Sequence, residues 1–228
     1  MKIPKIIHQT WKTEEIPTKW IPYQQRVKEL HPDWEYRLWT DEDNDAFVQK
    51  EYPEFLDVFR GFPKVIHRVD VIRYLILYKM GGLYLDLDYE MLKPFDFAEA
   101  NIVLPKNRSL SFGDHADEIG NCIIASIPGH PFWKDVVDDL HMSPPETDNH
   151  LDVIKDTGPL LLTRILRSNH YPDITTPDRM LFHPPLPRTK RGYEAIRNNN
   201  LSYGIHHCWG SWIEKYSWRH IKNAFGFS

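Results

Sequence analysis

The sequence predicts an α/β fold in one domain, with a mainly parallel central sheet flanked by helices. Short apolar runs that are typical of buried strands alternate along the chain with segments whose apolar residues have helical spacing. The length of 228 residues is enough for one domain with a full core. No internal repeat or linker interrupts the alternation, so we expect residues 1–228 to form a single domain.

The first part of the chain alternates strand and helix. A short apolar run ends at Thr10 and Trp11, and the motif that begins at Thr40 and places an acid three positions later is typical of a helix start. The expected elements are, in order, a strand at 5–9, a helix at 19–30, a strand at 35–40 and a helix that opens at 40–43.

A longer helix is predicted over residues 65–80. Its apolar residues form a helical stripe, and the pair Gly81 and Gly82 directly after it is typical of a helix end. The stripe consists of Val65, Val69, Ile72, Ile76 and Met80. Beyond the glycines, we expect strands at 83–87, 101–105 and 122–126 and helices at 130–141 and 157–169.

The charge of the chain argues against nucleic acid as a partner. The formal net charge is −4 and the pI is about 6.3, so there is no general basic field for phosphate groups. Two cysteines, Cys122 and Cys208, do not make a disulfide framework and suit a reducing compartment, with one bridge at most. We therefore expect a small-molecule partner.

No segment is predicted to cross a membrane. Residues 1–12 lack the pattern of a signal peptide, and no apolar run reaches the ~18 residues that a span needs. The aromatic content of 13%, with eight Trp, is high. This content is consistent with aromatic rings that bind a ligand or lie on a membrane surface. The expected location is cytoplasmic, with peripheral membrane association as an open alternative.

Two acidic residues, Asp86 and Asp88, stand at alternate positions in the otherwise apolar segment MGGLYLDLDYEMLKP. In a strand, residues two apart face the same way, so the two carboxylates are expected to project together. Like charges held together raise one pKa unless a cation lies near them, and carboxylate oxygens favour Mg²⁺ or Mn²⁺. The alternative for an isolated pair of this kind is a solvated strand end.

Asp70 and Arg73 form a second charged pair, on the helix at 65–80. They lie about 60° apart around the helix axis, on the flank of the apolar stripe. One interpretation is a structural ion pair at the surface, between side chains three residues apart on the helix. The other is a buried pair that needs further partners to offset its desolvation, which a polar ligand would supply.

Three functional classes are considered for this chain. The phrase YLDLDYEML superficially resembles the motif of haloacid-dehalogenase-like phosphatases, but that motif normally ends the first strand of its domain, and here several elements precede it. A noncatalytic nucleotide-sugar or glycan-binding module is a further alternative. The third class is a metal-dependent sugar transferase.

Six separated phrases together resemble the D-x-D glycosyltransferases of family 32, in the family's order and over nearly the whole chain. This family includes yeast mannosyltransferases and many bacterial capsule and viral sugar transferases, and it is distantly similar to the glucosylating clostridial toxins. The phrases are IPKIIHQTW (3–11), HPDWEYRLWTDED (31–43), HRVDVIRYLILYKMGGLYLDLD (67–88), NCIIASIPGHPFW (121–133), DTGPLLLT (156–163) and IHHCWGSW (205–212).

The resemblance implies a GT-A fold and the transfer of a sugar, with retention of configuration, from a nucleotide diphosphate sugar with Mn²⁺ or Mg²⁺. The donor base, uracil or guanine, stays open, and the acceptor is a glycan, lipid-linked or protein hydroxyl. By position, the resemblance implies stacking on the base by Trp11, contacts to the donor sugar by Asp70 and Arg73, contact to ribose, sugar or metal by Asp86, and direct metal binding by Asp88.

The last phrase implies the rest of the site. His206 or His207 would supply a further ligand on the metal side, with Ser211 as another candidate, and Trp212 would close over the donor. The loops at 109–121 and 182–193 are candidates for the acceptor pocket. No carboxylate is evident for a double displacement, so we expect a same-face mechanism in which the departing diphosphate helps to deprotonate the acceptor.

Overall fold

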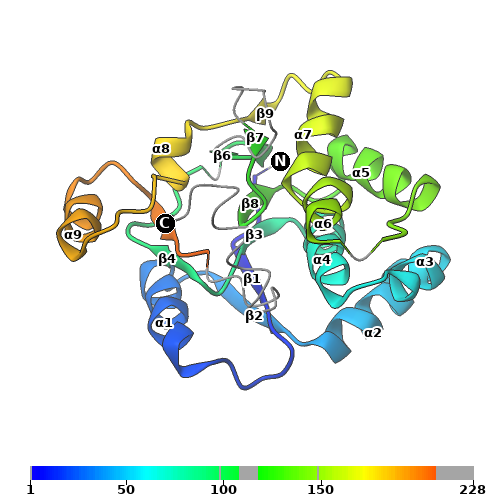
Figure 1. Cartoon of the computed structure of the whole chain (residues 1–228), viewed down its shortest axis with the longest axis horizontal. Helices are drawn as coiled ribbons and strands as arrows, with labels where there is room; N and C mark the ends of the chain where they lie inside the picture. Colours follow the sequence, from blue (N-terminus) through cyan, green and yellow to red (C-terminus); the bar gives the residue numbers. More distant parts are fainter. Residues whose placement is uncertain (1, 98, 108–117, 148, 209–228) are drawn as a thin grey trace.

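A six-stranded sheet forms the centre of the protein (Figure 1). The computed structural model describes residues 2–97, 99–107, 118–147 and 149–208. β8 runs antiparallel to both of its neighbours and the other pairings are parallel, which confirms the mainly parallel sheet. The strands are, in spatial order, β2 (Glu35–Trp39), β1 (Ile6–Thr10), β3 (Gly82–Leu85), β8 (Ile123–Ser126), β5 (Ile102–Val103) and β9 (Ile174–Thr175).

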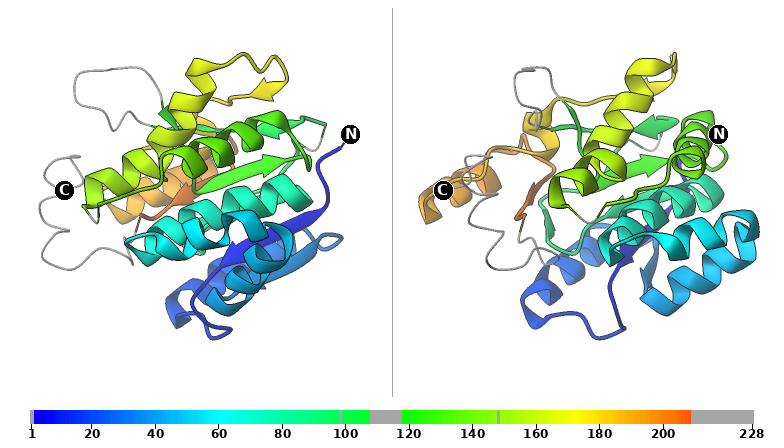
Figure 2. Two further views of the ribbon diagram at one scale, coloured as in Figure 1. Left: turned by 90° about the vertical axis from the view of Figure 1, so that its right-hand side faces the viewer. Right: turned by 45° about the vertical axis from the view of Figure 1, so that its right-hand side comes forward.

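Helices flank this sheet, as predicted, and Figure 1 and the right view of Figure 2 show α1, α8 and α9 apart from the group of α2 to α7. The described helices are η1 (Thr18–Trp20), α1 (Ile21–Leu30), α2 (Asp41–Glu51), η2 (Pro53–Phe55), α3 (Leu56–Gly61), α4 (Val65–Met80), α5 (Pro131–Met142), α6 (His150–Asp156), α7 (Pro159–Ser168), α8 (Arg179–Phe182) and α9 (Lys190–Asn198). In the described ranges, none of these helices has the length and apolar character that crossing a membrane requires.

Two apolar clusters cover opposite faces of the sheet. Tyr84 of β3 packs in the cluster of α4, α5 and α7, whereas Leu83 and Leu85 pack in a second cluster with Val27 of α1 and Phe182 of α8. This alternation follows from the two-residue period of a strand. α4 lies in the first cluster, and its residues from Val71 to Leu77 are buried. This burial explains why apolar residues occur almost all the way around the helix.

A tight glycine turn joins α4 to β3. Gly81 and Gly82 have φ values of +66° and +102°, in the region that favours glycine. A Cβ on Gly82 would lie only 2.6 Å from the carbonyl oxygen of Ile6 in β1. The glycine pair therefore lets β3 approach β1 directly, so that the ends of these two strands lie side by side.

Two short antiparallel pairs lie beside the main sheet and were not predicted. β4 (Tyr89–Met91) pairs with β10 (Gly204–His206), and β6 (Lys106–Asn107) pairs with β7 (Glu118–Ile119). In the first pair, His206 lies opposite Tyr89. A segment far along the chain is thereby placed next to the acidic motif.

Most predicted elements are present, with ends that differ by one to a few residues. The capping box at Thr40 is confirmed, because its hydroxyl accepts from the Asp43 amide and the Asp43 carboxylate accepts from the Thr40 amide. One expectation is wrong: β3 ends at Leu85, so Asp86 and Asp88 do not lie in the strand. The Tyr89 amide donates to the Asp86 carbonyl oxygen and closes a turn, and this turn brings the two acids together.

Candidate active site

The site is built where β1 and β3 end. Asp86 follows β3 directly, and its carbonyl oxygen accepts from the Gln9 amide group of β1 at 3.3 Å. Asp88 lies in the turn that leads into β4, and its carbonyl oxygen accepts from the His207 amide at 3.1 Å. The strand ends, the turn and β10 therefore meet at one edge of the sheet, where ligands of α/β sheets bind.

Asp86, Asp88 and His206 form a three-residue group with the ligand atoms within 4.8 Å of one another. His206 Nε2 lies 3.2 Å from Asp88 Oδ1 and 3.8 Å from Asp86 Oδ2. Their side chains are 14% to 25% exposed, so solvent reaches them. Two carboxylates and an imidazole are a donor set that fits a divalent cation, and the carboxylates suit Mn²⁺ or Mg²⁺.

Arg73 of α4 links this group to the helix pair found in the sequence. Its guanidinium contacts Asp86 Oδ1 at 3.1 Å and Asp70 Oδ1 at 3.0 Å, and it donates to the Asn121 carbonyl oxygen at 2.7 Å. It also lies over the ring of Tyr84, 4.6 Å from the centroid. With a side chain only 4% exposed, Arg73 is a buried cation with several partners, which a buried ion pair requires.

The Asp70 carboxylate has two partners besides Arg73. Asn121 donates to Asp70 Oδ1 at 3.0 Å and the Thr157 hydroxyl donates to Asp70 Oδ2 at 3.1 Å. Burial raises the pKa of Asp70 to about 7, and the charge of Arg73 acts in the opposite direction. The pair is therefore buried and not a surface ion pair, and its further partners within the protein are Asn121, Thr157 and Asp86.

Asp86 is oriented by a second set of contacts. The Tyr84 hydroxyl donates to Asp86 Oδ1 at 2.9 Å and lies 3.2 Å from the hydroxyl of Thr10. Burial raises the pKa of Asp86, while Arg73 lowers it. Sequence reasoning missed the roles of Asn121, Thr157 and Tyr84, because nothing in the spacing of these residues reports what their side chains touch.

His207 points away from the acidic pair. Its Nε2 lies 2.9 Å from Glu90 Oε2, and its ring stacks on Tyr23 with the centroids 4.9 Å apart. Arg197 of α9 holds both oxygens of Glu90. Burial acts to raise the pKa of Glu90, but the hydrogen bonds from His207 and Arg197 lower it to about 2. The geometry thus favours His206 over His207 as the imidazole on the metal side.

Trp11 directly follows β1, and its amide donates to the Trp39 carbonyl oxygen at the end of β2. Its ring is half-buried and lies edge-on against Trp20, with the centroids 4.5 Å apart. Ser211 and Trp212, the other two expected residues, lie outside the described residues, as does most of the loop at 109–121.

Both cysteines are free, so the single bridge that the sequence allowed is absent from the described residues. Cys122 Sγ lies 3.1 Å from His183 Nε2, and Cys208 Sγ lies 3.3 Å from His206 Nδ1. The thiol of Cys208 therefore borders the imidazole that faces Asp88.

A family model described as "Glycosyltransferase sugar-binding region containing DXD motif" matches residues 17–110. Inositol phosphoceramide mannosyltransferase 3 of Schizosaccharomyces pombe is 44% identical over 167 residues, which cover 72% of this chain and 44% of that protein. Mannosyl phosphorylinositol ceramide synthase CSH1 of Saccharomyces cerevisiae is 39% identical over 163 residues, which cover 71% of this chain and 42% of that protein. The chain thus spans less than half the length of these relatives.

The solved structure of the PaToxG glycosyltransferase is similar to this fold, with a TM-score of 0.52 and 20% identity over 73% of this chain and 70% of that chain. At this identity the likeness concerns the fold alone, and it confirms the expected GT-A type. Together, the matches confirm the resemblance seen in the sequence and do not favour the phosphatase or the noncatalytic module.

Proposed function

Since this chain belongs to the glycosyltransferase family whose sugar-binding region contains a DXD motif, we propose that it is a metal-dependent transferase that uses a nucleotide diphosphate sugar. The observation that carries the proposal is the group of Asp86, Asp88 and His206, joined through Arg73 to Asp70. The group has the donor atoms for a divalent cation, and the buried pair beside it has acceptors and donors for sugar hydroxyls.

We propose a role for each residue of the site. Asp88 and His206 would hold Mn²⁺ or Mg²⁺, which when bound neutralises charge on the leaving diphosphate. Asp86, fixed by Arg73, would contact the ribose, the sugar or the metal, and Asp70 would accept from donor-sugar hydroxyls. Trp11 would stack on the base, an interaction worth ~1 to 3 kcal/mol.

We infer mannose as the sugar and a phosphoinositol-containing sphingolipid as the acceptor. The support is the similarity to proteins named inositol phosphoceramide mannosyltransferase and mannosyl phosphorylinositol ceramide synthase. This narrows the earlier choice among glycan, lipid-linked and protein hydroxyls. Peripheral association with a membrane, where such a lipid resides, would follow from this acceptor.

For the stereochemistry, we infer retention by a same-face mechanism. Asp70 is held by Arg73, Asn121 and Thr157, and the nearer carboxylate, Asp86, is held by Arg73 and Tyr84. Asp88 faces His206. None of these three carboxylates is placed as an unengaged nucleophile. An oxygen of the leaving diphosphate would therefore take the proton of the acceptor hydroxyl as that hydroxyl attacks the sugar.

A transfer assay tests the function. GDP-mannose and UDP-hexoses are offered with inositol phosphoceramide, and the products are followed by mass spectrometry, with phosphatidylinositol as the comparison acceptor. We expect a mannosylated inositol phosphoceramide whose formation stops with EDTA and returns with Mn²⁺, and whose anomeric configuration by NMR is that of the donor. Transfer of another hexose would overturn the sugar assignment, and an inverted product would overturn the mechanism.

A further inference from the structure

A basic segment lies at the outside of the molecule, next to the candidate site. From Arg179 to Arg197 the sequence has five Lys or Arg residues and one acid, Glu194, although the chain as a whole has a formal net charge of −4. This stretch includes the candidate acceptor loop at 182–193, whose end belongs to α9. Figure 1 and the right view of Figure 2 show α8 and α9 apart from the group of α2 to α7.

Three exposed cations stand at the start of α9. They are Arg188, Lys190 and Arg191, and the first turn of the helix has no acidic residue to oppose them. Within the part of the chain that the structure describes, none of the three forms an ion pair. The N-terminus of a helix adds a partial positive charge of its own. This end of α9 therefore presents concentrated positive charge to solvent.

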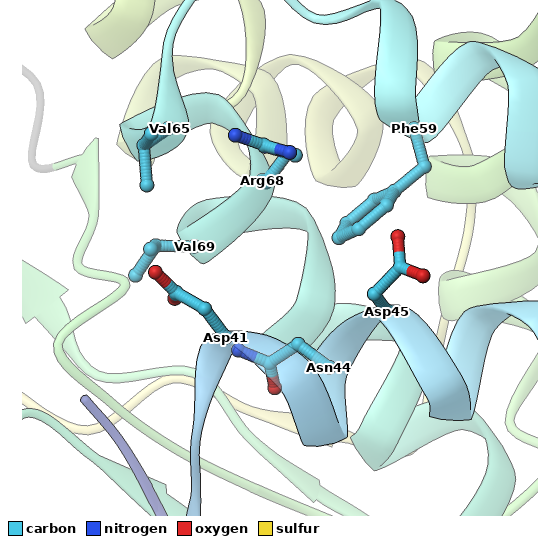
Figure 3. A pocket seen from close by; sticks show the side chains of 7 residues that line it. All are labelled: Asp41, Asn44, Asp45, Phe59, Val65, Arg68 and Val69. Carbon is cyan, nitrogen blue, oxygen red and sulfur yellow. The ribbon is translucent and has the colours of Figure 1, made fainter. Parts of the chain in front are cut away.

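The cations near α2, by contrast, are matched by acids. A cavity of about 330 Å³, including its mouth toward solvent, lies between the first turns of α2 and α4. Arg68 lines it together with Asp41 and Asp45 (Figure 3). Arg60 of α3 also donates to Asp45, with Nε 2.8 Å from Oδ1. The uncompensated charge at α9 is thus a property of that surface.

Two exposed apolar side chains lie at the other end of the basic segment. Met180 of α8 is 40% exposed, and Leu201, which follows α9, is 49% exposed. The two are neighbours, because the hydroxyl of Ser202 donates to the Met180 carbonyl oxygen at 2.9 Å. Cations flank both: Arg179 directly precedes Met180, and Lys93 donates to the Leu201 carbonyl oxygen at 3.0 Å. Apolar side chains next to Lys and Arg are typical of surfaces that bind at a bilayer interface.

The inner side of α9 is fixed to the candidate site. Arg197 donates to the two oxygens of Glu90 at 2.7 and 2.9 Å, and Tyr193 stacks on the ring of His207 with the centroids 5.9 Å apart. The backbone amide of His207 in turn donates to the Asp88 carbonyl oxygen at 3.1 Å. A partner bound to the outer side of α9 is therefore held close to the acidic motif.

We propose that the α8–α9 segment, residues 179–201, docks the protein on an anionic bilayer, an inference that rests on the proposed lipid acceptor. A phosphoinositol-containing lipid carries a phosphate charge, so a bilayer that contains it has a negative surface. Each Lys or Arg close to such a surface raises the affinity about fivefold, and the attraction is screened by salt. Met180 and Leu201 enter the headgroup region. Docking in this way brings the acceptor headgroup to the candidate site.

Vesicle flotation tests this surface with phosphatidylcholine vesicles that contain or lack phosphatidylinositol. The α9 variant carries Arg188→Gln, Lys190→Gln and Arg191→Gln. A control variant removes the same charge from exposed positions on α2, α5 and α6. Its substitutions are Lys50→Gln, Lys134→Gln and Lys155→Gln.

Wild type and the control variant should bind the vesicles that contain phosphatidylinositol, less tightly as salt is raised, and should not bind phosphatidylcholine alone. The α9 variant should bind roughly a hundredfold more weakly than wild type, because it lacks three cations. Met180→Ser combined with Leu201→Ser should also weaken binding, but should leave its dependence on salt unchanged.

Mn²⁺-dependent binding of GDP and UDP, followed by calorimetry, separates docking from the proposed function. All variants should keep the nucleotide affinity of wild type, since none of the changed residues belongs to the candidate site. Equal binding to the two kinds of vesicle, or equal losses in the α9 and control variants, would overturn the docking surface and leave the proposed function standing. Failure of wild type to bind either nucleotide with Mn²⁺ would instead overturn the proposed function.

Discussion

At the scale of single residues, Arg73 organises the site. One buried guanidinium bonds the carboxylates of Asp70 and Asp86 and the carbonyl oxygen of Asn121, and it packs on Tyr84. Removing one partner of such a network leaves a buried charge without compensation, which costs about 3 to 5 kcal/mol. The network therefore fixes the orientation of Asp86 before a donor binds.

The two adjacent histidines should differ in function. His206→Ala should weaken Mn²⁺ affinity roughly tenfold or more, because its Nε2 faces Asp88, whereas His207→Ala should leave Mn²⁺ affinity within about twofold, because its Nε2 contacts Glu90. Paramagnetic resonance of free Mn²⁺ during titration measures both affinities, and circular dichroism checks the fold. Equal losses in the two variants would contradict the assignment.

His8 should make stability depend on pH. It is fully buried, its Nδ1 accepts from Trp39 Nε1, and its Nε2 donates to the Gly81 carbonyl oxygen. Burial lowers the pKa of His8 from 6.5 to about 4. The unfolded chain therefore binds a proton that the folded chain does not, so this contribution, roughly 3 kcal/mol, is complete above pH 6.5 and is lost as the pH falls toward 4.

The measurement is urea unfolding of wild type and His8→Gln at pH 7.5 and pH 5. The stability difference between the two proteins should shrink at pH 5, because only wild type has the titrating ring. The exposed His170, changed to Gln, serves as the control and should show a difference near zero at both pH values. A gap between wild type and His8→Gln that stays constant across this range would exclude the proposed titration.

At the scale of elements, local patterns predicted the helices and strands better than their assembly. The apolar stripe and the glycine pair predicted α4 as Val65–Met80, because both signals are local. The β4 and β10 pair was missed, since three-residue strands far apart in sequence carry too short a pattern. For the same reason, the sequence predicted a metal ligand at His206 or His207 without distinguishing them. The register of β10 distinguishes the two, because His206 faces Asp88 and His207 contacts Glu90.

The glycine turn before β3 should be the least tolerant part of this assembly. Gly82→Ala should destabilise the protein by at least about 2 kcal/mol, because its φ is +102° and the added Cβ would meet the Ile6 carbonyl oxygen at 2.6 Å. Gly61→Ala, where a Cβ meets nothing within 4 Å, should stay within about 1 kcal/mol of wild type. Equal midpoints of denaturant unfolding for the two variants would refute this account of the turn.

At the scale of the whole molecule, one sheet is shared by two apolar clusters, and we infer from this that residues 1–228 act as one domain. The sequence predicted the parallel sheet and the edge at which the site lies, because strand and helix alternation determines both. It could not predict the cavity beside α2, since that cavity depends on side chains brought together by the tertiary fold. The turn from Asp86 to Tyr89 is closed by a local backbone hydrogen bond, but its sequence alternates like a continuing strand, and it was therefore predicted as part of the strand.

The central claim is that Asp88 binds a metal on which nucleotide diphosphate binding depends. Calorimetric titration of GDP and UDP into wild type and Asp88→Asn, each with and without Mn²⁺, tests it most directly. The account predicts that wild type binds at least one of the two nucleotides only with the metal, and that Asp88→Asn loses this binding while circular dichroism shows an unchanged fold. Binding by Asp88→Asn with the same affinity and the same Mn²⁺ dependence as wild type would contradict it.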